Sequence, residues 1–170
     1  MRKIIQIFVF FLIANVTVSS VSAQLPKVLA FGNITYANPV GSELKNISNY
    51  GIGYEVGAGV GFGKTILTAS IGRINFHLPD QVLNGVTVFS EEDFKVTPIR
   101  FGVRRYLLLG LFVNGNLGLA ATNSKSYFLY EAGGGYKLGF FEIGASYMGF
   151  KMGNLDCGSI LFKGGLAIKL

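Results

Sequence analysis

Apolar residues alternate strictly with glycine or charge over residues 50–62, whose sequence is Tyr-Gly-Ile-Gly-Tyr-Glu-Val-Gly-Ala-Gly-Val-Gly-Phe. One face of this segment is continuously apolar, and the other is glycine except for Glu55. A repeat of two residues predicts a β-strand with two unlike faces. Thirteen residues is long for a strand of a soluble domain. The length suits a tilted strand that crosses a bilayer, where about nine to eleven residues lie in the hydrocarbon.

The same repeat predicts eight strands along the chain. They cover residues 28–36, 50–62, 65–77, 94–106, 111–121, 126–138, 140–150 and 157–170. The connections alternate between short turns and mostly longer polar loops, of which 37–49 and 78–93 are the longest. This alternation, with an even strand number, is typical of membrane barrels with short periplasmic turns and longer extracellular loops. The sequence therefore predicts an all-β fold, an eight-stranded antiparallel up-and-down transmembrane barrel.

The N-terminal residues 1–23 have the layout of a secretory signal peptide. A basic start precedes an apolar run over residues 4–14 and a small-residue stretch that ends at Ala23. A retained transmembrane helix is the alternative, but the run falls short of the roughly 20 apolar residues that such a helix needs. We expect cleavage after Ala23, a barrel domain over residues 24–170, and location in the bacterial outer membrane.

Composition agrees with a membrane barrel. Charged residues make up 14% of the chain, and 24 of the 170 residues are glycine, against about 25% and about 7% in ordinary soluble proteins. Residues 24–170 hold 13 basic and nine acidic side chains, a net charge of +4. This charge is small and scattered, so we expect no nucleic-acid partner.

The polar faces of the predicted strands hold charges together with glycines, as in Arg100-x-Gly-x-Arg104 and Glu131-x-Gly-x-Gly-x-Lys137. A water-facing surface has no need of glycines, which weaken strands. We interpret these faces as the lining of a narrow lumen, where glycines leave room for long charged side chains from across the barrel. The opposite faces, apolar or aromatic, would meet lipid. A soluble barrel of the lipocalin type, apolar inside, is the alternative.

The third predicted strand departs from this pattern. Its apolar face runs from Leu67 to Ile71 and then reaches Arg73. A β-bulge near Gly72 would shift the phase and turn Ile74 and Phe76 toward lipid. We therefore predict a bulge there, with Arg73 in the lumen.

The lumen charges form the main candidate site. The set consists of Glu55, Arg73, Arg100, Arg104, Glu131, Lys137, Glu142, Lys163 and Lys169. Because buried charges must be paired, we expect a salt-bridge network that fills the barrel. The alternative is a narrow pore that favours anions, since cations exceed acids six to three.

With these features the chain resembles the small eight-stranded outer-membrane barrels of the OmpA/OmpX type. Among them it is most similar to the porin-family "outer membrane protein beta-barrel" domains of Bacteroidota, the group that includes PorT-like proteins. The resemblance rests on the export signal, the hairpin 50–78, the segment 96–106 and the C-terminal strand 162–170. It implies contact with outer-membrane lipid and recognition of the last strand by the barrel-insertion machinery, although this strand ends in Leu170 rather than an aromatic residue.

Two further patterns suggest chemistry. Residues 58–65 match a relaxed phosphate-loop pattern, but that loop must open a helix, and here it lies between two predicted strands. His77 is the only histidine and raises the alternative of a lipid-modifying hydrolase, although no nucleophile motif accompanies it. We expect no enzymatic activity and no cofactor.

The second long loop is acidic, with Asp80, Glu91, Glu92 and Asp93. Their spacing is not that of a calcium loop, so we expect a solvated extracellular surface and no metal. Cys157 is the single cysteine, cannot form an internal disulfide and is expected to be a plain small residue. The predicted function is a monomeric, non-enzymatic barrel with a structural or surface-interaction role, whose loops 37–49 and 78–93 contact an extracellular partner. A small porin-like channel and a lipid hydrolase are the alternatives.

Overall fold

The structure is a computed structural model that describes residues 26–40, 48–77, 81–83, 86–88, 94–122, 125–153 and 155–170. The predicted signal peptide, residues 1–23, lies outside the described residues. So do the four loop acids, Asp80, Glu91, Glu92 and Asp93.

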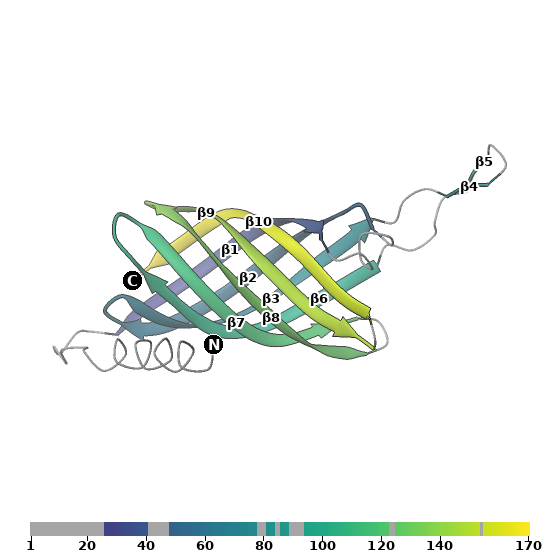
Figure 1. The fold of residues 1–170 in the computed structure, drawn as a ribbon. Coiled ribbons are helices and arrows are strands. Elements are labelled where there is room, and N and C mark those ends of the chain that lie inside the picture. The colour runs from purple at the N-terminus through teal and green to yellow at the C-terminus, as the bar shows by residue number, and fades with distance from the viewer. Residues whose placement is uncertain are drawn as a thin grey trace, which may run out of the picture.

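Eight antiparallel strands close into a barrel in the order β1-β10-β9-β8-β7-β6-β3-β2 (Figure 1). They are β1 Lys27–Pro39, β2 Tyr50–Phe62, β3 Thr65–His77, β6 Phe94–Tyr106, β7 Leu111–Ala121, β8 Ser126–Leu138, β9 Phe141–Met152 and β10 Leu155–Lys169. The first and last of these strands pair over Leu29↔Lys169 to Pro39↔Ser159, so the sheet has no open edge. The predicted eight-stranded antiparallel barrel is confirmed, and β2, β3, β6, β7 and β8 have the predicted bounds.

The predicted loop 78–93 contains a short hairpin that the sequence pattern did not indicate. Strand β4 covers Gln81–Leu83 and pairs with β5, Val86–Val88. The hairpin lies beyond one end of the barrel, and the C-terminus lies at the opposite end (Figure 1). We name these the loop end and the turn end.

The turn end holds the three tight connections, β2–β3, β6–β7 and β8–β9. Gly63 and Gly139 adopt positive φ values of 59° and 61° in two of them. That backbone conformation costs glycine little and other residues more, which explains the glycine at each turn. At the same end, Val28 and Leu170 exchange backbone hydrogen bonds of 2.9 and 2.8 Å.

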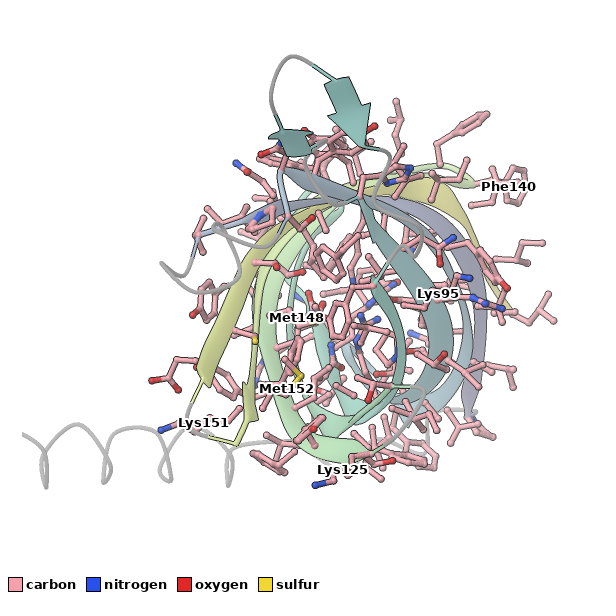
Figure 2. The ribbon with its side chains drawn as sticks, turned by 90° about the vertical axis from the view of Figure 1, so that its right-hand side faces the viewer. Lys95, Lys125, Phe140, Met148, Lys151 and Met152 are labelled. Carbon is pink, nitrogen blue, oxygen red and sulfur yellow. The ribbon has the colours of Figure 1, made fainter. Side chains whose placement is uncertain are left out.

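Burial alternates along most of each barrel strand and identifies the two faces of the sheet. Large apolar side chains are exposed on the outside, among them Ile34 at 71%, Phe101 at 65% and Ile143 at 66%. Met148 and Met152 lie inside the ring of strands, whereas Phe140, Lys125 and Lys151 point away from it (Figure 2). No helix among the described residues is long and apolar enough to cross a membrane.

The predicted bulge in the third strand was wrong. The β2–β3 register runs without interruption from Tyr50↔His77 to Phe62↔Thr65. Arg73 is therefore exposed on the outside, and Ile74 and Phe76 are buried inside at 1% and 0% exposure. The physical reason is that the inside of the barrel is apolar at the loop end, so inward Ile74 and Phe76 need no change of phase.

Candidate functional site: the barrel lumen

The lumen is built in three layers. An apolar layer occupies the loop end, and each of its members is at most 2% exposed; it consists of Ala37, Ile74, Phe76, Val96, Ala120, Leu129, Met148, Phe150, Cys157 and Leu161. A second apolar layer occupies the turn end and consists of Leu29, Phe31, Ile66, Tyr106, Phe112 and Ala167. Charged side chains lie between the two. We name these the loop-end layer, the turn-end layer and the charged layer.

Four residues from four strands form the first part of the charged layer. Arg100 on β6 forms ion pairs with Glu55 on β2 and, at 2.8 Å, with Glu131 on β8. Lys163 on β10 lies 2.9 Å from Glu55 and 2.7 Å from Glu131. Two cations and two carboxylates thus alternate in a ring of contacts that ties non-adjacent strands together. Removal of one member would leave an uncompensated charge in a buried site, which is strongly destabilising.

A second cluster lies nearer the turn end. Arg104 forms a 2.9 Å ion pair with Glu142, which also accepts a 3.1 Å hydrogen bond from the Asn33 amide. The guanidinium carbon of Arg104 lies 4.7 Å from the ring centre of Phe31 and 4.6 Å from that of Phe112. A planar guanidinium between two aromatic rings is held by cation–π attraction as well as by its carboxylate partner. Phe31 and Phe112 therefore join the charged layer to the turn-end layer.

Six of the nine predicted lumen charges meet in these two clusters: Glu55, Arg100, Arg104, Glu131, Glu142 and Lys163. The other three are basic and lie elsewhere. Lys137 donates to the carbonyl of Gly139 at a turn, Lys169 lies 4.4 Å from the ring centre of Tyr106, and Arg73 is outside. The charged layer thus holds three cations and three acids. Lys137 and Lys169 keep the inward parity of their strands but lie near the turn end, so only Arg73 contradicts the predicted inward set.

Sequence reasoning missed two parts of the lumen. Asn33 was not singled out, although a polar residue between apolar neighbours at the inward position of β1 was a usable signal. The loop-end layer was also missed, although Leu129, Met148, Phe150 and Leu161 have the same strand parity as the lumen charges. Charge and glycine at the other inward positions led to the expectation of a polar lumen throughout.

The inward glycines make room mainly for neighbouring strands. A Cβ at Gly57 would lie 2.7 Å from the carbonyl oxygen of Ala69 and would overlap the ring of Phe31. A Cβ at Gly135 would lie 2.6 Å from Cζ of Phe112. Both aromatic rings belong to the adjacent strands, β1 and β7. We expected these glycines to leave room for long charged side chains from across the barrel. At Gly57 and Gly135 they instead leave room for the two aromatic rings that enclose Arg104.

A small cavity lies in the charged layer. Its volume is about 30 Å³, and its lining includes Asn33, Ser70, Asn114, Asn116 and Lys163. Such a volume holds about two water molecules. It lies between the two apolar layers, so the described residues leave no wide polar path along the lumen.

The other candidate residues do not assemble a catalytic site in the described part of the chain. His77 points outward and stacks on Tyr50 at 4.7 Å between ring centres, and Tyr50 stacks on Tyr36 at 6.2 Å. Residues 58–65 form the end of β2, a turn and the start of β3, so no helix follows the glycines. Cys157 is buried in the loop-end layer. Within the described residues, no three His, Cys, Asp or Glu side chains form a group that could hold a metal ion.

Comparison with known proteins identifies the fold. No protein-family profile matches the sequence, and no curated protein is significantly similar to it. Ail, the attachment invasion locus protein of Yersinia pestis, is structurally similar in its crystal form, with a TM-score of 0.56 and 16% identity over 84% of this chain and 97% of Ail. In a phospholipid bilayer nanodisc, Ail gives a TM-score of 0.58 and 18% identity over 84% and 99% of the two chains.

A crystal structure of Ail with the heparin analogue sucrose octasulfate also matches, with a TM-score of 0.53 and 16% identity over 84% of this chain and 97% of Ail. Neisserial surface protein A gives a TM-score of 0.56 and 14% identity over 85% of this chain and 97% of its own. At these identities the comparison concerns architecture alone. This chain has the fold of the small outer-membrane β-barrels.

Proposed function

We propose that this protein is an integral, non-enzymatic protein of the bacterial outer membrane, a rigid barrel whose long loops contact an extracellular partner. One observation carries the proposal: a closed barrel with an apolar outer surface encloses a lumen that is filled at both ends. The outside suits lipid, and the described residues that line the inside leave little room for a substrate or a solute. The long loops are then the part of the molecule that remains for recognition.

The outer surface supports membrane insertion. Exposed apolar side chains surround the barrel on all eight strands, whereas soluble monomers rarely expose contiguous apolar patches above a few hundred Å². Tyr36, Tyr50, Tyr54, Tyr130 and Tyr147 lie on the outside toward the loop end, and Phe62, Phe140 and Phe141 lie toward the turn end. Two aromatic bands flanking an apolar belt are typical of membrane barrels. A lipocalin-like soluble barrel would have the reverse arrangement.

The packed lumen argues against the alternative of a porin-like channel. The charged layer is neutral and fully paired between acids and cations, and its cavity of about 30 Å³ lies between two apolar layers. We expect the refolded barrel to give no stable single-channel conductance in planar bilayers. Stable, reproducible channels would overturn the proposal in favour of the porin function.

Charge suggests what kind of partner the loops take. Loop 78–93 has four acidic residues and no basic one, and loop 37–49 has one of each. Ail was crystallised with the polyanion sucrose octasulfate, but a loop with four carboxylates repels polyanions and attracts cationic surfaces. We therefore propose a partner with a basic surface rather than a sulfated sugar.

Beads coated with polylysine test this part of the proposal on cells that display the protein. Replacing Asp80, Glu91, Glu92 and Asp93 by their amides should abolish most of the protein-dependent binding, and high salt should do the same. A variant with Glu43→Gln in the other loop is the matched control and should bind nearly as the wild type does. Equal binding by the amide variant and the wild type would refute the role of the acidic loop.

The finer assignments belong to the same proposal. A cleaved signal peptide requires that the mature protein begin at Gln24, which N-terminal sequencing of the membrane-extracted protein determines. The termini would be periplasmic, the insertion machinery would recognise β10, and the barrel would be a monomer. The outward Phe162, Leu166 and Ile168 of β10 support that recognition. Kinship with the Bacteroidota barrel domains rests on the sequence segments alone.

Catalysis by His77 is the weakest alternative. Its ring packs against Tyr50 on the outside, and Ser48 reaches only its backbone carbonyl, at 2.9 Å. A His77→Ala variant should leave the lipid composition of the host membrane unchanged.

A further inference from the structure

Toward the loop end, the outward positions of β3 and β6 are polar over a longer stretch than those of the other barrel strands. Arg73, Asn75 and His77 occupy the last three outward positions of β3, and Lys95 and Thr97 occupy the first two of β6. On the neighbouring β2, the outward side chains at the same height are Tyr54, Ile52 and Tyr50. We name the five residues on β3 and β6 the basic patch. Two basic side chains, Arg73 and Lys95, therefore lie next to the outer apolar belt.

A groove lies directly below this patch. It is lined by Tyr54, Val56, Ile71, Gly72, Arg73 and Thr97 and has a volume of about 240 Å³. Pairing between β3 and β6 is interrupted at this height: Ile71↔Ile99 and Ile74↔Val96 are paired, but Gly72 and Arg73 are not. The register places Pro98 opposite Gly72, and proline has no N–H to donate to the ladder. The interrupted pairing thus coincides with a local depression in the outer wall.

The groove has an apolar end and a cationic end. Val56 and Ile71 line its lower part, toward the turn end, and Arg73 and Lys95 lie at or above its upper part, toward the loop end. Asn75 pairs with Lys95, so Arg73 and Lys95 are diagonal neighbours on adjacent strands, with Cβ atoms about 7–8 Å apart. Two flexible cationic side chains at that spacing can contact one anionic group together.

Neither cation is neutralised within the described part of the protein. Arg73 is exposed, and neither it nor Lys95 forms an ion pair with an acidic residue of the described ranges. By contrast, the exposed Lys151 at the same end of the barrel lies 3.3 Å from Asp156. A charge on the lipid-facing side of a barrel costs much more free energy at the middle of the bilayer than near the interface.

The height of Arg73 fits an interface position. Arg73 lies four positions before His77 at the end of β3, a distance of about 13 Å along the strand. His77 stacks with Tyr50 in the outer aromatic band, and Tyr54 is the cross-strand neighbour of Arg73. A long side chain at this depth extends toward the headgroups while its stem stays in the apolar region. From this depth the Arg73 side chain can reach the headgroups, and Lys95 lies nearer the loop end (Figure 2).

We propose that the basic patch and the groove below it bind one anionic lipid of the surrounding leaflet. Arg73 and Lys95 would contact a headgroup phosphate, and an acyl chain would lie in the groove against Val56 and Ile71. Charge-assisted contacts between guanidinium and phosphate are shorter and stronger than neutral hydrogen bonds. The inference rests on the proposed membrane location and adds a lipid-binding site to it.

Native mass spectrometry of the intact refolded barrel in maltoside micelles tests the proposal, with bis-phosphorylated lipid A, phosphatidylglycerol or phosphatidylcholine added in turn. The wild type should retain one lipid A or phosphatidylglycerol molecule and little phosphatidylcholine. The R73Q/K95Q double variant should lose affinity for the anionic lipids by about tenfold or more, which corresponds to at least about 1.4 kcal/mol. The matched control is K64Q/R105Q, which removes two exposed cations near the turn end and should change the affinity by less than about twofold.

Three results would overturn the inference. These are equal retention of phosphatidylcholine by the wild type, wild-type affinity in R73Q/K95Q, and an equal loss in K64Q/R105Q. Inorganic phosphate at millimolar concentration should not displace the lipid; full displacement would assign the site to free phosphate instead. Heat-modifiable gel mobility monitors folding, and the single variants R73Q and K95Q replace the double variant if it does not fold. A wild type that fails to insert into bilayers would refute the membrane location, whereas insertion without lipid selectivity would refute this site alone.

Discussion

Arg100→Met is the most informative perturbation of the charged layer. The Arg100 side chain is 2% exposed and lies between the carboxylates of Glu55 and Glu131. Methionine keeps a long apolar side chain and removes the charge. The variant therefore leaves two buried carboxylates that share Lys163 as their partner, at 2.9 and 2.7 Å.

The expected cost is large because the loss leaves a net charge in a buried site. Breaking a buried ion pair by removal of one partner costs about 3–5 kcal/mol. In the double variant Arg100→Met/Glu131→Gln, one cation and one carboxylate remain, so the charge balance is restored. Its destabilisation should be at least about 2 kcal/mol smaller than the sum of the two single variants, which measures the coupling. The exposed Lys151→Met variant, which breaks the surface pair with Asp156, should cost less than about 1 kcal/mol.

The assay is equilibrium unfolding by urea of the barrel reconstituted in lipid vesicles. The chain has no tryptophan, so the folded fraction is measured by far-UV circular dichroism and by heat-modifiable gel mobility. The free energy of unfolding comes from linear extrapolation, with the m-value checked for constancy between variants.

Two outcomes would refute the reasoning. If Arg100→Met costs no more than Lys151→Met, the charged layer is not buried as the structure describes. If the single and double variants are additive, the four side chains do not act as one network.

Three further predictions address packing and strand phase. Gly57→Val should destabilise the barrel by about 1–3 kcal/mol in the same unfolding assay, because the new side chain overlaps the ring of Phe31. Gly164→Ala should be near neutral, because a Cβ at this position meets no atom within 4 Å beyond its chain neighbours. Met148→Ala should cost about 2–5 kcal/mol by opening a cavity in the loop-end layer, and wild-type stability would show that this layer is not close-packed. In a Cys157→Ala background, Arg73→Cys should react with a membrane-soluble maleimide and Ile74→Cys should not, because only the first position faces outward. The reverse pattern would support a bulge near Gly72.

Much of the fold could be predicted from the sequence because lipid and lumen impose different chemistry on alternate residues. The strict alternation in β2 and the Arg-x-Gly-x-Arg pattern in β6 identify both the strands and their inward faces. Strand β3 is the exception. Its polar residues near the loop end belong to the outside, and its Ile74 and Phe76 belong to the inside, so hydrophobicity alone gives the wrong phase.

The candidate site was accessible to sequence reasoning only in part. The alternation of side chains along each strand identified which charges face inward, because every second residue of a strand points to the same face of the sheet. It could not give their height along the barrel axis, which depends on strand tilt and on the stagger between neighbours. Height separates Lys137 and Lys169, which lie by the turns, from Arg100 and Lys163 in the charged layer. The interrupted pairing opposite Pro98 likewise could not be predicted from the pattern of one strand, because it depends on the register between β3 and β6.

The sequence by itself therefore determined the number of barrel strands, their order and the existence of an apolar face, since these follow from local alternation and connection length. Closure of the barrel decided the rest. It brought Glu55, Arg100, Glu131 and Lys163 together from four strands, balanced their charges, and packed apolar layers on both sides of them. It also placed Arg73 and Lys95 as diagonal neighbours on adjacent strands of the outer surface. Contacts across a closed sheet join residues that are far apart in the chain, and only the three-dimensional register fixes which ones meet.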